Sequence, residues 1–301
     1  MSAASLPFSP LDGSTADRVI RAAGMFTTAY LVAGVGPLIL HARATADWRP
    51  LGAHLVVLAA AALVMFSHQV WLRPVRDWLP LALGPFLYVE LRWLIEGMGR
   101  PHADAVVQGW ERALFPDAPA ATWATSLPVR WISEALHLAY ASYYLLVYLP
   151  PLILYARRRR EAYAATLLAL ALVYGACFTA YLFFPVDGPR FLVGPSAAPD
   201  GPVRAFVLHL LDVGSSRGTA FPSSHVAASL VASLSALRHQ PRIGIVVSVF
   251  TVGLALATVY GGFHYAVDAL AGAVVGLAAW LSANALCRAL SGPGAQSASA
   301  P

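Results

Sequence analysis

Apolar residues gather into long runs along this chain, and most polar residues fall between the runs. A helix needs about 20 mostly apolar residues to cross the hydrocarbon of a bilayer. Eight runs approach that length, near residues 19–40, 51–72, 77–97, 131–155, 162–184, 222–238, 243–260 and 264–287. The pattern predicts an all-α, polytopic membrane bundle of about eight transmembrane helices around a six-helix core.

Two longer connections, residues 98–130 and 185–221, separate some of these runs. In the first, apolar residues recur at helical spacing opposite a polar face, which predicts a helix lying in the membrane interface. The apolar positions are Ala103, Val106, Val107, Trp110 and Leu114, and the polar ones are Asp104, Gln108, Glu111 and Arg112. The second connection is long enough to act as a lid.

Arginine residues concentrate in every second connection between the predicted spans. All 20 basic residues are arginines, and the strongest cluster is the run at residues 157–160. Because arginine is enriched in short cytoplasmic loops, both termini are expected inside. The segments "FPVDGPR", "FPSSH" and "GGFHYAVD" then gather on the outer face.

Composition supports a membrane protein, since 58% of the residues are hydrophobic and only 12% are charged. The net charge of +5 suits anionic lipid, and the chain offers no soluble basic domain for nucleic acid. Cys177 and Cys287 fall in apolar runs and are interpreted as packing residues.

The expected organisation has four parts. They are a disordered N-terminus at 1–17, N-terminal spans with the interfacial helix at 18–130, a catalytic core at 131–290, and a disordered tail at 291–301. A lysine-free, alanine-rich composition suggests a bacterial inner or plasma membrane, with the candidate site facing outward.

His264 and Asp268 are spaced i, i+4, which places them on one face of a helical turn. The carboxylate can fix one imidazole nitrogen and leave the other as a nucleophile. The same spacing also suits an ordinary histidine at a helix end.

The stretch "PSSH" begins another run at Pro222. The backbone N–H groups of Ser223 and Ser224 at a helix N-terminus would form an anion site, with His225 beside it as a proton donor. Plain serine capping is the alternative interpretation.

Arg190 and Arg217 follow on the same face, and guanidinium groups bind phosphate oxygens. Contact with lipid headgroups is the alternative for both. Two histidines, a carboxylate, a helix N-terminus and arginine together suit phosphoryl transfer through a phosphohistidine.

These residues resemble the motifs of the type 2 phosphatidic acid phosphatase superfamily. Its Pro-Ser-x-His motif matches residues 222–225, and its His-x-x-x-Asp motif matches His264 and Asp268. The resemblance covers roughly residues 163–288. It implies a helical-bundle core, His264 as nucleophile, Asp268 as its partner and His225 as general acid, without a metal or another cofactor.

Two departures from the superfamily pattern favour one of its branches. Phe183 and Thr258 stand where the phosphatases carry a lysine and an arginine. Both losses resemble the branch of inositol phosphorylceramide and sphingomyelin synthases. The resemblance implies transfer of a phospho-headgroup to a hydroxyl. Asp104 and Glu111 on the interfacial helix can accept hydrogen bonds from such a hydroxyl and are candidate acceptor-binding residues. Hydrolysis of phosphatidic acid or a polyprenyl pyrophosphate at the same site is the alternative.

Two other functions stay open on the sequence. His225, His264 and Asp268 could form a facial metal triad. Alternatively, Glu90, Arg92 and Glu96 could serve a transporter as intramembrane charges, although Arg92 and Glu96 can also pair at i, i+4. The expected partner in the enzyme interpretation is a membrane phospholipid or lipid phosphate.

Overall fold

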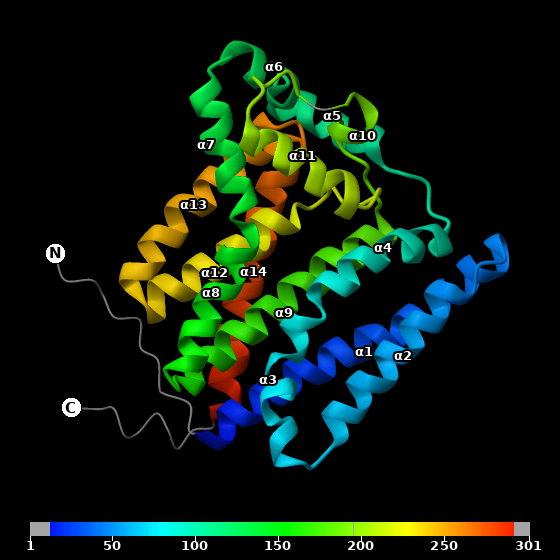
Figure 1. The fold of residues 1–301 in the computed structure, drawn as a ribbon, viewed down its shortest axis with the longest axis vertical. Helices are drawn as coiled ribbons and strands as arrows, with labels where there is room; N and C mark the ends of the chain where they lie inside the picture. Colours follow the sequence, from blue (N-terminus) through cyan, green and yellow to red (C-terminus); the bar gives the residue numbers. More distant parts are fainter. Residues whose placement is uncertain (1–12, 195, 292–301) are drawn as a thin grey trace.

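The computed structural model describes residues 13–194 and 196–291, and this part of the chain is almost entirely helical (Figure 1). Its only β-type pairing is an isolated bridge between Val186 and Thr219. The helices are α1 (Gly13–Thr45), α2 (Arg49–Phe66), η1 (Val70–Leu72), α3 (Arg73–Ala82), α4 (Gly84–Met98), α5 (Asp104–Leu114), α6 (Pro119–Ser126), α7 (Arg130–Ala141), α8 (Tyr143–Ala156), α9 (Arg160–Phe183), α10 (Pro189–Leu192), α11 (Pro202–Gly214), α12 (Ser224–His239), α13 (Pro241–Tyr260) and α14 (Ala266–Ser291). The predicted all-α class is confirmed.

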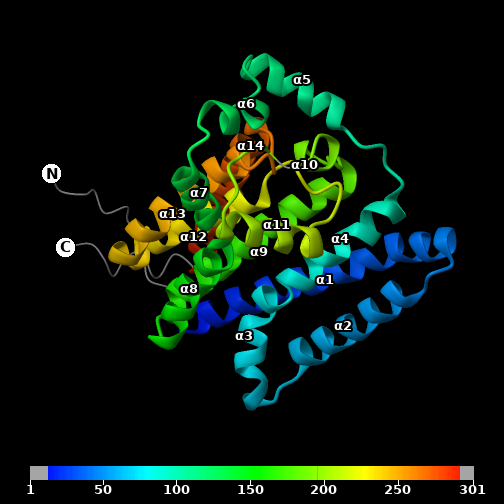
Figure 2. The same cartoon turned by 45° about the horizontal axis from the view of Figure 1, so that its top comes forward.

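Helix α12 is the centre of the bundle. It packs against α8, α9, α13 and α14, while α1 packs on α9 and carries α2, α3 and α4 with it. Figure 1 shows α5, α6 and α10 together at one end of the molecule, with the junction of α8 and α9 toward the other end. Figure 2 shows α5, α6 and α10 capping the end of the bundle formed by α9, α12 and α14.

Two glycines set the spacing between α12 and α14. A Cβ atom on Gly272 would lie 2.4 Å from the Ser223 carbonyl oxygen, and one on Gly276 would lie 2.6 Å from the Ala227 oxygen. Small residues four apart allow such backbone approach between membrane helices. The backbone of α14 therefore rests directly on the first turns of α12.

Two histidine–carboxylate pairs tie the N-terminal helices together. His54 of α2 places Nδ1 2.7 Å from Glu90 of α4, while its Nε2 bonds the Leu31 carbonyl of α1 at 2.8 Å. His41 of α1 lies 3.1 Å from Glu96 of α4. The predicted Arg92–Glu96 pair is wrong, because Glu96 pairs with His41 and the Arg92 Nε–H bonds the Val89 carbonyl.

The structure does not bear out all eight predicted spans. Within the described residues, five helices are long and apolar enough to cross a membrane, or up to six if α7 and α8, bent by 44°, form one span. The expected span at 77–97 is divided between α3 and α4, and it includes Asp77, Glu90, Arg92 and Glu96. The expected span at 222–238 corresponds to α12, which has only 16 residues.

The predicted termini lie mostly outside the described residues. Helix α1 already begins at Gly13, inside the segment expected to be disordered, and α14 ends at Ser291. At the end of the bundle away from α5, Arg160 bonds both Asp77 and Asp17, and Arg73 also bonds Asp17. This cluster is consistent with the arginine-rich side inferred from the sequence.

The orientation can be tested by cysteine labelling. Val193 beside α10 is 84% exposed and Arg157 after α8 is exposed, so a cysteine at either position would be accessible. Because arginine-rich ends face the cytoplasm, we expect an impermeant maleimide to label Val193→Cys but not Arg157→Cys in intact spheroplasts. The native Cys177 and Cys287 are buried and give little background. The reverse labelling pattern would contradict the outward-facing site.

Candidate active site

His264 and Asp268 come together at the start of α14. His264 lies in the turn that precedes the helix, not inside it as predicted, and its amide bonds the Thr258 carbonyl at 3.0 Å. Its Nδ1 lies 3.5 Å from Oδ2 of the fully buried Asp268, which also accepts the Tyr265 amide at 2.8 Å. This separation is long for a hydrogen bond, and catalytic contacts commonly tighten when substrate binds.

His225 faces the same cleft from the first turn of α12. Its ring centroid lies 6.2 Å from that of His264. Tyr140 stacks on it at 5.2 Å, Tyr143 lies at 4.3 Å, and Tyr88 meets it edge-on at 6.4 Å. Among the described residues no carboxylate pairs with His225. The two histidines therefore have different surroundings, and only His264 has a carboxylate to orient it.

Arg190 enters the cleft from α10 with its guanidinium already bonded. Its Nη1 donates to the Ser215 hydroxyl at 2.5 Å and its Nη2 to Asp212 at 2.6 Å. The side chain of Arg190 is 12% exposed, whereas that of Asp212 is 72% exposed. The exposed partner can be exchanged for a phosphate oxygen without burying an unpaired charge.

Arg217 does not line the cleft. It points to Asp187 at 3.2 Å, and its side chain is 63% exposed. The cleft itself is lined by Tyr88, Tyr140, Asp187, Arg190, Phe191, Leu211, Ser215, Ser216, Thr219, Ala220, His225, Phe263 and His264. Three predicted residues thus share one cleft, with Asp268 directly behind them, while Arg217 lies at its outside.

The predicted anion site on the amides of Ser223 and Ser224 is wrong in this structure. The Ser223 N–H donates to the Asp268 carbonyl at 3.0 Å, and the Ser224 N–H donates to the Tyr181 hydroxyl at 3.1 Å. Both serines are buried, so their amides need partners inside the protein. Ser223 instead acts as the N-cap of α12, with its hydroxyl facing the Val226 amide at 3.5 Å.

Asp104 and Glu111, predicted to bind an acceptor, bind backbone amides in this structure. Asp104 accepts the amides of Asp187 and Gly188 at 3.1 and 3.0 Å. The buried Glu111 accepts the first two amides of α14, from Ala266 at 3.1 Å and Val267 at 2.9 Å. Both carboxylates are occupied by backbone donors, and the helix α5 that carries them is confirmed.

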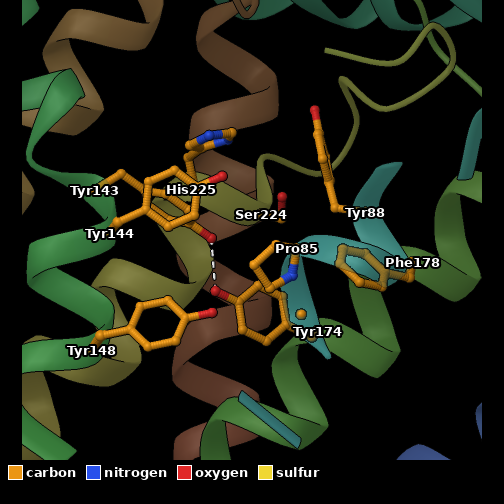
Figure 3. A pocket seen from close by; sticks show the side chains of 10 residues that line it. Pro85, Tyr88, Tyr143, Tyr144, Tyr148, Tyr174, Phe178, Ser224 and His225 are labelled. Atoms are coloured by element: carbon orange, nitrogen blue, oxygen red, sulfur yellow. Dashed lines mark hydrogen bonds between the residues drawn. The ribbon is translucent and has the colours of Figure 1, made fainter. Parts of the chain in front are cut away.

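Two apolar pockets that share Tyr88 and His225 adjoin the cleft, and together they are here termed the aromatic groove. Figure 3 shows the pocket beside α4 and α9. Tyr144 and Leu210 are 57% and 46% exposed, so the groove reaches the outside of the bundle beside α8 and α11. It is lined mainly by Tyr88, Tyr140, Tyr143, Tyr144, Tyr148, Tyr174, Phe178, Val207, Leu210 and Leu211. None of these residues was among the predicted site residues, although the cluster "YASYYLLVY" at 140–148 shows an unusual density of tyrosine.

A larger cavity of about 470 Å³ lies on the other side of the 262–265 turn, lined in part by Gln108, Gly262 and Tyr265. The Tyr265 hydroxyl accepts a hydrogen bond from Gln108 at 2.9 Å, and burial raises the pKa of this hydroxyl above its usual value. Neither histidine of the site lines this cavity. The larger cavity and the histidine cleft are therefore lined by different residues, and cavity volume does not identify the candidate site.

The residues predicted as a metal triad are not the ones whose ligand atoms lie close together. His225, His264 and Asp268 do not form a close group of metal-ligand atoms in the described part of the chain, but His102, Asp104 and Asp187 do, within 4.8 Å. Asp104 already accepts two amides, and Asp187 accepts the Gly218 amide and contacts Arg217. Those donors occupy the oxygens that a cation would need.

Comparison with known proteins adds to this geometry. A profile described as the PAP2 superfamily matches residues 105–282, more than half of the chain. The chain belongs to the PAP2 superfamily. The matched PAP2 region extends from α5 into α14 and contains every candidate site residue except Asp104, while α1 to α4 lie outside it.

One relative is a PA-phosphatase related-family protein of Dictyostelium discoideum. It is 27% identical over 199 residues, which cover 56% of this chain and 36% of that protein. The chain thus matches about a third of this relative's length. No solved structure matches the chain. The assignment to the PAP2 superfamily therefore rests on the sequence match together with the motif residues seen in the cleft.

The Tyr181 hydroxyl offers a test of how the start of α12 is held. It donates to the Pro222 carbonyl at 2.8 Å and accepts the Ser224 amide, so Tyr181→Phe leaves two buried backbone groups without partners. We expect the free energy of unfolding to fall by about 2 kcal/mol, measured by denaturation in detergent. Tyr30→Phe is the matched control, because the buried Tyr30 hydroxyl has no hydrogen-bond partner in the described structure. Equal losses in both variants would refute this role of Tyr181.

Proposed function

We propose that this protein is a membrane lipid phosphotransferase that moves a phospho-headgroup to a hydroxyl acceptor through a phosphohistidine on His264. The observation that carries the proposal is the junction of the histidine cleft with the aromatic groove. The cleft offers a nucleophile and an arginine to a phosphoryl group, while the groove offers an apolar wall to the attached chain. A lipid that carries a phosphate has both parts.

The reaction has two steps. First, Nε2 of His264 attacks phosphorus while Asp268 holds Nδ1, and the bond from phosphorus to the leaving lipid oxygen breaks. His225 gives that oxygen a proton. In the second step His225 takes a proton from the acceptor hydroxyl, whose oxygen attacks phosphorus and releases His264. Arg190 holds the phosphoryl oxygens throughout.

The acceptor distinguishes the two forms of the proposal. A lipid or polyol hydroxyl makes the enzyme a transferase of the kind suggested by the synthase branch, and water makes it a lipid phosphate phosphatase. The name of the Dictyostelium relative favours the phosphatase form. The limited supply of cations favours transfer, because Arg190 is the one arginine that lines the cleft in the described structure, and a phosphodiester carries a single charge.

The two positions without a cation lie outside the lining of the cleft. Phe183 is 58% exposed and its ring centroid lies 6.0 Å from the Arg100 guanidinium, and Thr258 is fully buried in α13. Transfer is therefore favoured by the lining of the cleft itself, in which Arg190 is the one arginine among the described residues.

The roles of the histidines can be separated by leaving group. We expect His264→Ala to abolish turnover, because no nucleophile remains. His225→Ala should lose about 10²- to 10⁴-fold with alkyl leaving groups and much less with an aryl phosphate, whose acidic leaving group needs little protonation. Steady-state rates with both substrate types in mixed micelles provide the measurement. An equal loss for both types would remove His225 as the general acid.

Transfer and hydrolysis can be separated with a panel of lipids. We expect diester phospholipids with a hydroxyl acceptor to be turned over faster than phosphatidic acid with water, because the cleft offers few cations to a dianion. Purified protein is incubated with phosphorus-labelled donors, and the released phosphate is separated from the transferred headgroup. Rapid dephosphorylation of phosphatidic acid or a polyprenyl pyrophosphate, with no transfer product from any diester, would establish the phosphatase form.

A further inference from the structure

Helix α5 crosses the end of the bundle beside the histidine cleft, with Asp104 and Glu111 of its polar face turned toward the protein. Val107 and Glu111 are buried, whereas Val106, Trp110 and Leu114 are 46%, 42% and 59% exposed. An amphipathic helix on a soluble protein would bury its apolar face. The inward polar face therefore has partners of its own in this protein.

Those partners are backbone amides in the two segments that carry the site. Asp104 and Glu111 are spaced i, i+7, two turns apart on α5. Asp104 accepts consecutive amides of Asp187 and Gly188, just ahead of Arg190. Glu111 accepts consecutive amides of Ala266 and Val267, between His264 and Asp268.

We infer that Asp104 and Glu111 form a clamp, here termed the α5 clamp, that sets the position of Arg190 relative to the His264–Asp268 pair. Both are positioning residues, since neither lines the histidine cleft. The inference deepens the proposed function and rests on it for its catalytic consequence. The claim that Asp104 and Glu111 hold these two segments in place does not depend on which reaction is catalysed.

The bonds at Glu111 suit this role. Its carboxylate faces the N-terminus of α14, where free amides and the helix dipole favour a negative charge. Hydrogen bonds from amides to a carboxylate are about twice as strong as those between neutral groups. The Asp268 carbonyl and its Oδ2 are used by Ser223 and Tyr265, so α14, α12 and the 261–265 turn meet at this point.

Aromatic contacts hold α5 itself in place. Trp110 stacks on Phe184 at 5.8 Å, with the planes 12° apart, and meets Phe221 at 5.5 Å. Phe184 follows α9 and Phe221 precedes α12. The clamp is therefore fixed to the ends of the same helices that form the site.

Glu134 of α7 supplies a matched control. It accepts consecutive amides of Val203 and Arg204 in the first turn of α11, at 2.9 and 3.0 Å. The donors are of the same kind as at Glu111, but α11 carries neither His225, His264 nor Arg190. The partners of Arg190, Asp212 and Ser215, lie at the opposite end of α11 from the amides that Glu134 binds. A general effect of losing one helix cap would appear in both variants.

The experiment compares Glu111→Gln, Asp104→Asn and Glu134→Gln in the full chain. Amide hydrogen exchange is measured by mass spectrometry, and kcat and KM are measured with the best donor from the lipid panel. Glu111→Gln should speed exchange at 264–268, and Asp104→Asn at 187–190, each by about 10-fold or more. We expect kcat of Glu111→Gln to fall by about 10- to 100-fold with little change in KM, because the nucleophile is displaced.

Glu134→Gln should speed exchange only near residues 203–204 and lower kcat much less than Glu111→Gln does, because the partners of Arg190 lie at the other end of α11. Glu111→Asp, which keeps the charge on a shorter side chain, should recover part of kcat. Unchanged exchange at 264–268 in Glu111→Gln would overturn the clamp, and so would equal losses of kcat in Glu111→Gln and Glu134→Gln. If the wild-type protein turns over no lipid, the proposed function fails, while the exchange measurement still decides the structural inference.

Discussion

Backbone amides at buried helix starts must find acceptors, and the end of the bundle that carries the histidine cleft depends on that constraint. The first amides of a helix have no partner within it, and leaving them dry and unpaired costs about 1–3 kcal/mol each. Glu111 meets the start of α14, Glu134 that of α11, and Tyr181 that of α12. Every one of these acceptors comes from a different helix. Satisfying the amides therefore also joins the helices.

The geometry of the site follows from the same hydrogen bonds between helices. Asp268 accepts amides from Ser223 and Tyr265 while remaining beside His264. One carboxylate residue thus connects the start of α12 to the turn before α14. His225 and His264 are carried by those two elements, and their relative position follows from the backbone contacts.

The helices and the histidine pairing could be predicted from local sequence patterns, whereas the contacts between residues distant in sequence could not. Apolar runs indicated the helices, and the spacing of His264 and Asp268 indicated a pair. The partners of Glu90 and Glu111 could not be found in this way, because they lie far away in sequence. The Ser223 and Ser224 amides were misassigned for the same reason, since a local motif does not show that Asp268 and Tyr181 already occupy them. Spacing predicts which residues lie near, but only the packing shows which lone pairs remain free.

The glycine contact between α12 and α14 has a consequence for motion. With Gly272 and Gly276 against the carbonyl groups of α12, a side chain at either position would force the backbones of these two helices apart. On this side of the site, backbone therefore packs directly on backbone. The opposite wall of the site, along α8 and α11, is closed only by side chains such as Tyr144 and Leu210, which change rotamer at small cost. Rotation of these side chains can therefore widen the aromatic groove on this flank without moving the backbone that carries His225 and Asp268.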